Sequence, residues 1–253
     1  VREIMRNLPE EKIVYFGDTA RVPYGSKSAE TVTRYSRQIV RFLQTQNVKA
    51  IVIACNTASA FALETIEKEI DLPILGVVKP GAEMALKTTK NKRIGVIATE
   101  GTIHSGLYQR LISQEDPEVS VYGQPCPLFV PLVEEGWTKD PVTEVVARRY
   151  LKELLEKDID TLIMGCTHYP LLRSLLRHVV GEKVTLVNPA YETAQALKRM
   201  LAELNLERDP SEDQEEGKYC FYASDAVERL NEFARRILPY EIVGTRQIPI
   251  EEY

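Results

Sequence analysis

Two cysteines occupy matching settings in the two halves of the chain. Cys55 follows the apolar run 50–54, and Cys166 follows the run 161–164 with one glycine between them. Each run predicts a buried parallel strand, and small hydroxyl or amide residues and then a helical pattern follow each cysteine. A thiol at the carboxyl end of a strand, facing a helix N-terminus, lies where backbone amide dipoles favour the thiolate. Two such thiols from two similar halves predict one thiol on each side of a substrate.

A packing role is the alternative for any single cysteine, because cysteine is among the most buried residue types. The Asn-Thr pair after the first cysteine and the Thr-His pair after the second are poor core formers. Their presence in both halves favours a functional role for both thiols. Cys126, between two prolines, and Cys220, in a run rich in Tyr and Phe, are interpreted as packing residues.

Residue spacing excludes several familiar cysteine sites. A phosphatase loop needs an arginine six positions after the cysteine, where this chain has Phe61 and Leu172. No C-x-x-C pair supports redox chemistry, and no Gly-rich loop supports nucleotide binding. Zinc needs about four clustered ligands, whereas the two cysteines and His168 offer three without finger-like spacing. We therefore expect neither a metal nor another cofactor.

Acid–base or nucleophilic chemistry remains for the two thiols. Thiols that face each other across a small molecule suit removal of a proton from one face and its return to the other, which inverts a stereocentre. The reference pKa of a thiol, about 8.5, lies close enough to neutrality for both protonation states to be reached.

The composition is that of a globular protein. The 253 residues are enough for two compact domains, and a net charge of −5 without any block of Lys and Arg argues against a nucleic-acid partner. No apolar run is as long as a membrane span, so no membrane partner is expected. The charged residues at 1–7 do not form a secretory signal, and four scattered cysteines do not form a disulfide framework. A reducing, cytoplasmic location is expected.

Strand-like and helical patterns alternate along the chain, which predicts an α/β fold with parallel sheets. The predicted strands are 12–16, 50–54, 73–78, 93–98, 119–122, 161–164, 184–187 and 218–223. The clearest helical stretches are 29–46, 60–70, 141–157 and 171–179, the first with Ser28 as its N-cap. The acidic stretch 205–218 predicts an exposed loop.

Two similar domains are expected, each with a parallel-type sheet flanked by helices. A break near 81–91 separates the two halves, and the C-terminal segment is expected to pack back on the first half. The predicted first domain is therefore discontinuous, 1–83 plus 190–253, and carries the first cysteine. The second domain, 84–189, carries the second cysteine, which places the active site in the cleft between the domains.

Four segments carry a more specific pattern. They are GDTARVPYG at 17–25, ACNTAS at 54–59, CPLFVPLVEEG at 126–136 and GCTHYP at 165–170. With these segments the chain resembles the glutamate racemases, which are cofactor-independent enzymes of the aspartate/glutamate racemase superfamily. The resemblance extends from about Leu8 to the final predicted strand.

The resemblance implies roles for four residues. Cys55 is expected to take the α-proton of D-glutamate and Cys166 that of L-glutamate, while the other thiol reprotonates the carbon. Glu134 and His168 match auxiliary residues that assist the Cys166 side. Two residues beyond Cys166, the imidazole is close enough to stabilise a thiolate or relay its proton. Without the resemblance, Glu134 is indistinguishable from its neighbour Glu135.

The resemblance also implies substrate binding by residues on the strand-to-helix turns. They are Tyr24, Gly25, Asn56, Thr57, Thr167 and His168, with Thr99 and Thr102 as weaker candidates whose alternative is a strand-ending turn. Helix N-termini that offer amide groups to carboxylates fit this role and account for the absence of an arginine cluster.

The family pattern begins with a strand and an Asp-Ser-Gly loop that this sequence lacks. In the family, the Asp assists the first cysteine and the Ser contacts the substrate. The sequence enters at the helix after that loop, and we expect a fragmentary or trimmed sequence. A chain without the segment is expected to fold poorly or turn over feebly.

The expected function is interconversion of L- and D-glutamate, supplying D-glutamate for peptidoglycan synthesis, by a homodimer. A racemase of another amino acid, such as aspartate, is the alternative among enzymes, because pocket size cannot be read from the sequence. A non-catalytic paralogue that acts through protein contacts is the alternative outside enzymes. Both retained thiols and Glu134 argue against that alternative.

Overall fold

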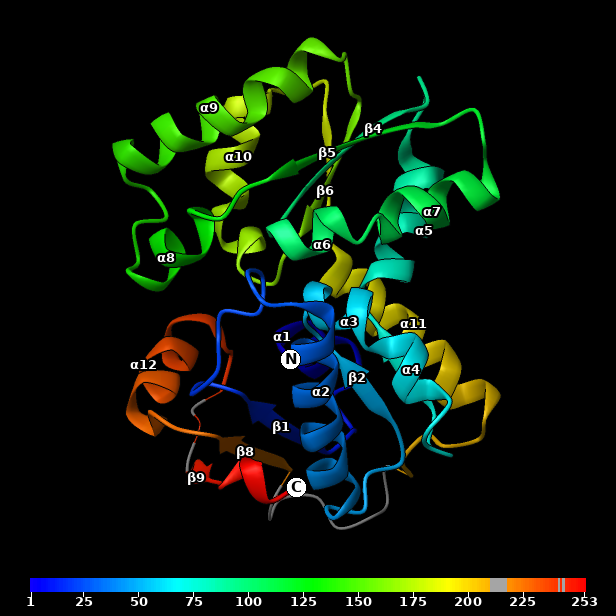
Figure 1. Ribbon diagram of the computed structural model, residues 1–253, viewed down its shortest axis with the longest axis vertical. Coiled ribbons are helices and arrows are strands. Elements are labelled where there is room, and N and C mark those ends of the chain that lie inside the picture. Colours follow the sequence, from blue (N-terminus) through cyan, green and yellow to red (C-terminus); the bar gives the residue numbers. More distant parts are fainter. Residues whose placement is uncertain (210–217, 241, 243) are drawn as a thin grey trace.

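The computed structural model describes residues 1–209, 218–240, 242 and 244–253, arranged as two lobes (Figure 1). The strands are β1 (Ile13–Gly17), β2 (Ile51–Ile53), β3 (Ile74–Gly76), β4 (Arg93–Ala98), β5 (Ser120–Pro125), β6 (Thr161–Gly165), β7 (Thr185–Val187), β8 (Tyr219–Ala223) and β9 (Arg246–Gln247). The helices are α1 (Arg2–Asn7), α2 (Ala29–Gln44), α3 (Asn56–Phe61), α4 (Leu63–Glu67), α5 (Val78–Thr88), α6 (Glu100–His104), α7 (Leu107–Glu115), α8 (Phe129–Glu134), α9 (Pro141–Glu156), α10 (Arg173–Val180), α11 (Pro189–Glu203) and α12 (Val227–Ile237). Two short 3-10 helices are η1 (Tyr169–Leu172) and η2 (Ile250–Glu252).

The lobe that contains Cys166 is built around a parallel sheet with the strand order β5-β4-β6-β7. Helices α8, α9 and α10 cover one face of this sheet, and α5 and α7 cover the other (Figure 1). Along β6, Leu162 and Met164 pack into the first of these cores and Ile163 into the second. Burial on both faces explains why this strand is a continuous apolar run in the sequence.

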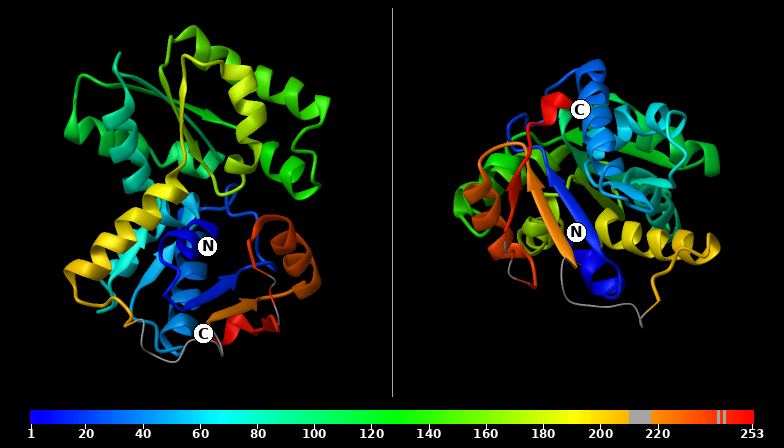
Figure 2. Two further views of the ribbon diagram at one scale, coloured as in Figure 1. Left: turned by 180° about the vertical axis from the view of Figure 1, so that it is seen from behind. Right: turned by 90° about the horizontal axis from the view of Figure 1, so that it is seen from below.

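The lobe that contains Cys55 holds two separate parallel sheets, β1-β8-β9 and β2-β3. The C-terminal segment returns to this lobe, because β8 pairs with β1 and α11 packs against α1 and β3 (Figure 2). A cavity of about 1060 Å³ lies between β1 and β2 and extends to both Cys55 and Cys166. The predicted domain boundary between residues 83 and 84 falls inside α5 and stays a prediction.

The carboxyl ends of strands from both lobes meet at the junction of the lobes. Cys55 follows β2, Thr99 follows β4 and Cys166 follows β6, and all three residues line the same cavity. The carboxyl edge of a parallel sheet is where functional groups of α/β proteins gather. The topology therefore brings groups from two sheets to one place.

The predicted elements agree with the structure except at three places. The helix predicted over 171–179 begins at Arg173 as α10, because the preceding residues form η1. Each predicted strand is present, and the Ser28 side chain accepts a hydrogen bond from Thr31 N at the start of α2, as expected of an N-cap. The helix predicted over 60–70 is instead the pair α3 and α4, and α3 begins at Asn56 because Cys55 caps it. The two-residue strand β9 is too short to leave a sequence pattern. Of the predicted loop at 205–218, residues 210–217 lie outside the described residues.

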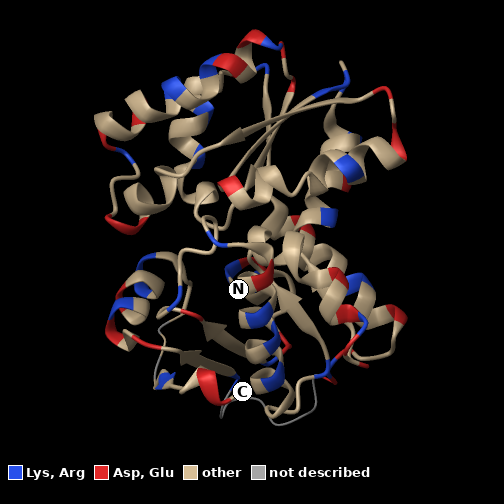
Figure 3. Cartoon of the chain, in the orientation of Figure 1, with Lys and Arg blue, Asp and Glu red and all other residues tan. Residues whose placement is uncertain are grey.

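Charged side chains lie on the helices and loops, whereas the strands are nearly free of them (Figure 3). Among the described residues, no helix combines the length and the apolar character that crossing a membrane requires.

Replacement of Leu162 tests the central role of β6. Leu162 is fully buried, so Leu162→Ala leaves a cavity and lowers the free energy of unfolding by roughly 2–5 kcal/mol. Urea denaturation measures the change. Val145→Ala on α9 is the control: Val145 is 68% exposed, and its truncation changes the free energy by no more than about 0.5 kcal/mol. Equal effects of the two substitutions contradict the assignment of β6 to the core.

Candidate active site

Cys55 is the N-cap residue of α3. Its backbone is extended, and its Sγ accepts a hydrogen bond from Ala58 N at 3.5 Å. Burial raises the pKa of the Cys55 thiol, and this effect outweighs the opposing hydrogen bonds from Ala58 and Thr57; the nearby Cys166 adds to the increase. The predicted contact with a helix N-terminus is therefore present, but desolvation decides the direction of the shift. The Cys55 thiol is held mainly protonated at neutral pH.

Cys166 faces the same cavity from the other lobe. It is 8% exposed and follows β6 directly. Its Sγ lies 3.7 Å from Nδ1 of His168. Cys55 and Cys166 both line this cavity, each from its own lobe. The structure thus brings together the two cysteines that the sequence singled out.

His168 contacts Cys166 on one side and Glu134 on the other. Nε2 of His168 lies 3.3 Å from Oε1 of Glu134, which is the last residue of α8. Burial lowers the pKa of His168, but hydrogen bonds and charges from Cys166 and Glu134 outweigh it and raise the pKa to about 9. His168 in turn lowers the pKa of Glu134. Glu135, the neighbour that the sequence could not separate from Glu134, is exposed.

Helix α12 of the Cys55 lobe contacts both Glu134 and His168. Nη2 of Arg229 lies 3.2 Å from Oε2 of Glu134, so the carboxylate contacts cations from both lobes. The ring of Phe233 lies one turn further along α12, with its centroid 6.1 Å from that of His168. Neither residue was predicted from the sequence, because their spacing on an amphipathic helix is that of an ordinary surface helix.

Three predicted threonines form one hydroxyl cluster across the junction of the lobes. Oγ1 of Thr57 lies 2.8 Å from that of Thr99 and 3.1 Å from that of Thr102, and the latter two are 3.0 Å apart. Beside the cluster, Gly101 N donates a hydrogen bond to Gly25 O at 2.8 Å. A Cβ atom on Gly25 would lie 2.6 Å from Cβ of Thr99, which explains the need for glycine at that position.

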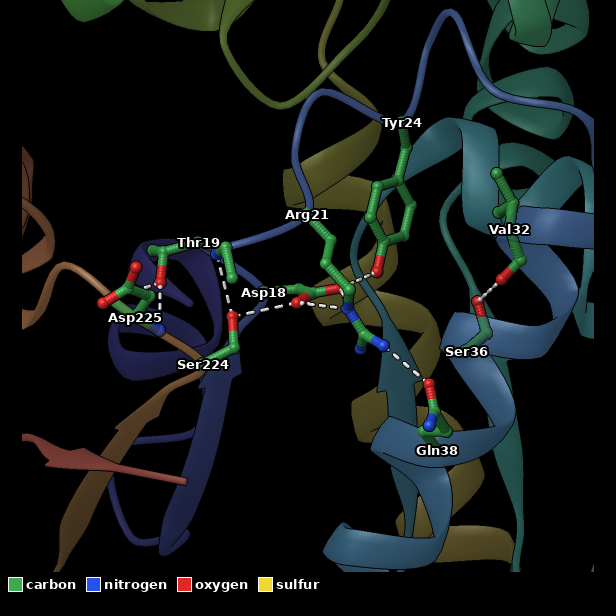
Figure 4. Close-up of polar contacts among 10 residues, drawn as sticks. Asp18, Thr19, Arg21, Tyr24, Val32, Ser36, Gln38, Ser224 and Asp225 are labelled. Atoms are coloured by element: carbon green, nitrogen blue, oxygen red, sulfur yellow. Dashed lines mark hydrogen bonds and ion pairs between the residues drawn. The ribbon is translucent and has the colours of Figure 1, made fainter. Parts of the chain in front are cut away.

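Tyr24 is held by the buried carboxylate of Asp18, which was not among the predicted site residues. The Tyr24 hydroxyl donates to Oδ2 of Asp18, and Ser224 donates to Oδ1 of Asp18 at 2.9 Å (Figure 4). Nε of Arg21 donates to both carboxylate oxygens at 2.9 Å. Burial and the Asp18 charge raise the pKa of Tyr24, so the hydroxyl stays a donor. Asp18 and Arg21 lie within the segment 17–25, whereas Ser224 left no sequence signal.

The remaining predicted binding residues also reach the cavity. Asn56 is buried, and its Oδ1 accepts a hydrogen bond from the hydroxyl of Tyr108 at 2.7 Å. Thr167 is exposed, with its Oγ1 3.4 Å from Nδ1 of His168. Of the predicted site residues only Thr102 does not line the cavity; it contacts the site through the threonine cluster.

The chain is similar to proteins of known activity over nearly its whole length. The family described as Asp/Glu/Hydantoin racemase matches residues 1–197. A glutamate racemase of Geobacter metallireducens is 46% identical over 251 residues, which cover 99% of this chain and 92% of that protein.

Solved structures agree with the sequence match. A glutamate racemase isoform from Bacillus anthracis is 37% identical with a TM-score of 0.92, covering 97% of this chain and 91% of its own. The glutamate racemase of Francisella tularensis, solved in complex with D-glutamate, is 34% identical with a TM-score of 0.91, covering 100% and 93%. These similarities confirm the predicted α/β fold class and the predicted resemblance. The chain belongs to the Asp/Glu/Hydantoin racemase family and is an isomerase, an amino-acid racemase.

Proposed function

We propose that the protein interconverts L- and D-glutamate by proton transfer at the α-carbon between Cys55 and Cys166. The observation that carries the proposal is that the two thiols line one cavity from opposite lobes. The relatives are glutamate racemases, and one similar structure holds D-glutamate. The retained pair of thiols supports racemisation over the non-catalytic alternative.

The two thiols exchange roles between the two directions. In one direction, the Cys55 thiolate removes the α-proton of D-glutamate, and the Cys166 thiol delivers a proton to the opposite face of the carbon. In the other direction, the Cys166 thiolate removes the proton of L-glutamate and Cys55 delivers one. A turnover of D-glutamate leaves Cys55 as the thiol and Cys166 as the thiolate, which is the state that a turnover of L-glutamate requires. The reverse turnover returns both cysteines to their first protonation states.

The two thiols have different electrostatic surroundings, and each suits proton transfer to and from the α-carbon. A protonated His168, 3.7 Å from Cys166 Sγ and supported by Glu134, stabilises a thiolate at that position. Cys55 has the N–H of Ala58 as its hydrogen-bond donor and lies where burial raises its pKa. The raised pKa keeps a proton on Cys55, which suits its role as the proton donor when L-glutamate is the substrate.

Polar groups around the cavity suit an amino acid with two carboxylates. Hydroxyls of Thr57, Thr99 and Thr167 and the amide of Asn56 lie beside the thiols, and hydroxyl and amide N–H groups are natural carboxylate donors. The enzyme is proposed to supply D-glutamate for peptidoglycan from the cytoplasm. All four cysteines lie in the described residues without a disulfide, which suits a reducing location. A homodimer remains the expectation from the family resemblance.

Solvent deuterium tests the assignment of the two bases. In deuterated water, the protein converts L- and D-glutamate into each other with deuterium entering at the α-carbon. Cys55→Ala and Cys166→Ala each lower the rate of inversion by roughly 10²–10⁴-fold, because each removes one general acid–base group. Polarimetry and loss of the α-proton NMR signal measure inversion and exchange.

The pattern of residual exchange separates the two roles. Cys55→Ala retains exchange only with L-glutamate, and Cys166→Ala only with D-glutamate. Cys126→Ala serves as the control, since Cys126 is a fully buried cysteine of the core whose Sγ contacts Gln124 O. Inversion that survives either active-site substitution at the wild-type rate rules out the two-thiol mechanism.

The charge of His168 predicts a pH-dependent stability. The pKa of His168 in the folded protein, about 9, lies above its ordinary value of 6.5. The stabilisation by protonated His168 is therefore fully present below about pH 6.5 and is lost as the pH rises through about 9. Urea unfolding of the wild type and His168→Gln at about pH 6, 8 and 10 is expected to give a difference that shrinks with pH. His104→Gln, at an exposed histidine of α6, is the control, and a pH-independent difference for His168→Gln contradicts the pairing.

A further inference from the structure

Tyr108 touches the immediate neighbours of both cysteines. It lies on α7 of the Cys166 lobe, is 4% exposed, and donates its hydroxyl proton to Oδ1 of Asn56, the residue after Cys55. Its ring packs beside Gly165, the residue before Cys166, where an added Cβ would lie 3.3 Å from Tyr108 Cε2. Figure 1 shows α7 and α3, the two helices concerned, on either side of the junction of the lobes.

The direction of the hydrogen bond fixes which end of the Asn56 amide is available. Among the described residues, the Tyr108 hydroxyl has no acceptor other than Oδ1 of Asn56. If the amide were reversed, the hydroxyl would accept from the NH₂ group and its own proton would be buried without a partner, which costs free energy. The carbonyl oxygen of Asn56 therefore faces Tyr108, and its NH₂ group is left for another acceptor.

That NH₂ group donates to no residue in the part of the chain that the structure describes, and its nitrogen is not fully buried. Asn56 lines the cavity beside Cys55. An amide NH₂ can only donate, so it matches a carboxylate and mismatches the NH₂ face of a carboxamide. Burial, with a further contribution from Cys166, raises the pKa of Tyr108, so the hydroxyl remains a donor over the working pH range.

We infer that Tyr108 is a positioning residue that orients Asn56 across the lobe junction so that its NH₂ group selects a substrate carboxylate. This inference rests on the proposed function, because it assigns part of the glutamate recognition of the same site. Tyr108 does not touch the reacting carbon; it acts through Asn56. Tyr108→Phe keeps the ring against Gly165 and removes only the hydroxyl.

The first readout is the division of the effect between KM and kcat. In Tyr108→Phe the Asn56 amide is free to turn, so KM for both enantiomers rises by about 10-fold while kcat stays within about threefold. Because L- and D-glutamate have equal free energies, kcat/KM must fall by the same factor in both directions. Tyr169→Phe is the matched control: it removes another buried tyrosine hydroxyl, one that donates to Cys126 O at 2.8 Å, and KM is expected to stay within about twofold.

The second readout is discrimination between a carboxylate and an amide. Glutamine replaces the side-chain carboxylate of glutamate by an amide, and isoglutamine replaces the α-carboxylate. One of these amides is expected to bind the wild type, measured as inhibition, far more weakly than glutamate binds. The ratio of the inhibition constant of that amide to the dissociation constant of glutamate is expected to fall by about 10-fold in Tyr108→Phe. The amide whose ratio narrows identifies the carboxylate that Asn56 binds. If the Tyr108 hydroxyl has only a structural role, Tyr108→Phe lowers the melting temperature and leaves the affinity ratios of both amides unchanged.

Binding of D-glutamate by calorimetry separates this inference from the proposed function. A wild type that binds glutamate but does not racemise it, with weaker binding in Tyr108→Phe, rejects the proposed reaction and supports the role of Tyr108. Racemisation with unchanged KM and unchanged amide ratios in Tyr108→Phe overturns the role of Tyr108 alone. A wild type that neither binds nor racemises glutamate overturns both.

Discussion

The contact between the two lobes is the constraint on which the site depends. Cys55 and Cys166 follow strands of different sheets, so no single lobe can place both thiols at one carbon atom. Short, directional hydrogen bonds span the junction: Thr57 to Thr99 at 2.8 Å, Gly101 N to Gly25 O at 2.8 Å, and Tyr108 to Asn56 at 2.7 Å. Hydrogen bonds weaken steeply with distance and angle, and proton transfer needs reacting atoms about 3–3.5 Å apart. The same contacts therefore fix the position of the lobes and of the chemistry.

The two sides of the site are similar in fold and different in electrostatics. Both thiols follow a parallel strand, but only Cys166 has a histidine beside it, connected to Glu134. The carboxylate of Glu134 also contacts Arg229 from the other lobe, although this arginine is 70% exposed and its contribution is screened by solvent. Repetition of a strand–cysteine–turn unit thus provides two bases, and residues outside the repeat give each base its own environment.

Much of the fold was predictable from the sequence because most strands contain short apolar runs, and two of them are buried on both faces. Burial on both faces is why β4 and β6 stand out as uninterrupted runs. Helix α3 was placed too late because Asn56, Thr57 and Ser59 look like turn residues, although all three are buried in the structure. The side chains of Asn56 and Thr57 line the cavity, whereas the Ser59 hydroxyl donates to Ile53 O and accepts from Val77 N. Tertiary contacts therefore override local propensity at these three positions.

Site residues that directly follow a strand could be predicted from the sequence. Residues whose role depends on contacts between distant segments could not. The cysteines, His168 and the threonines follow strands directly, so a strand pattern locates them. Tyr108 and Arg229 lie on helices whose sequences are those of ordinary amphipathic helices, and their roles arise only when the lobes meet. Ser224 is likewise brought to Asp18 only by the pairing of β8 with β1. Single-sequence patterns carry no information about such pairings.

A crystal structure with D-glutamate bound tests the central claim most directly. The account predicts that Sγ of Cys55 and Sγ of Cys166 lie on opposite faces of the substrate α-carbon, each within about 3.5 Å of it or of its proton. The α-proton of D-glutamate is predicted to point towards Cys55. Both thiols on the same face of the carbon, or one thiol displaced from it by the width of a water molecule or more, contradicts the two-base account.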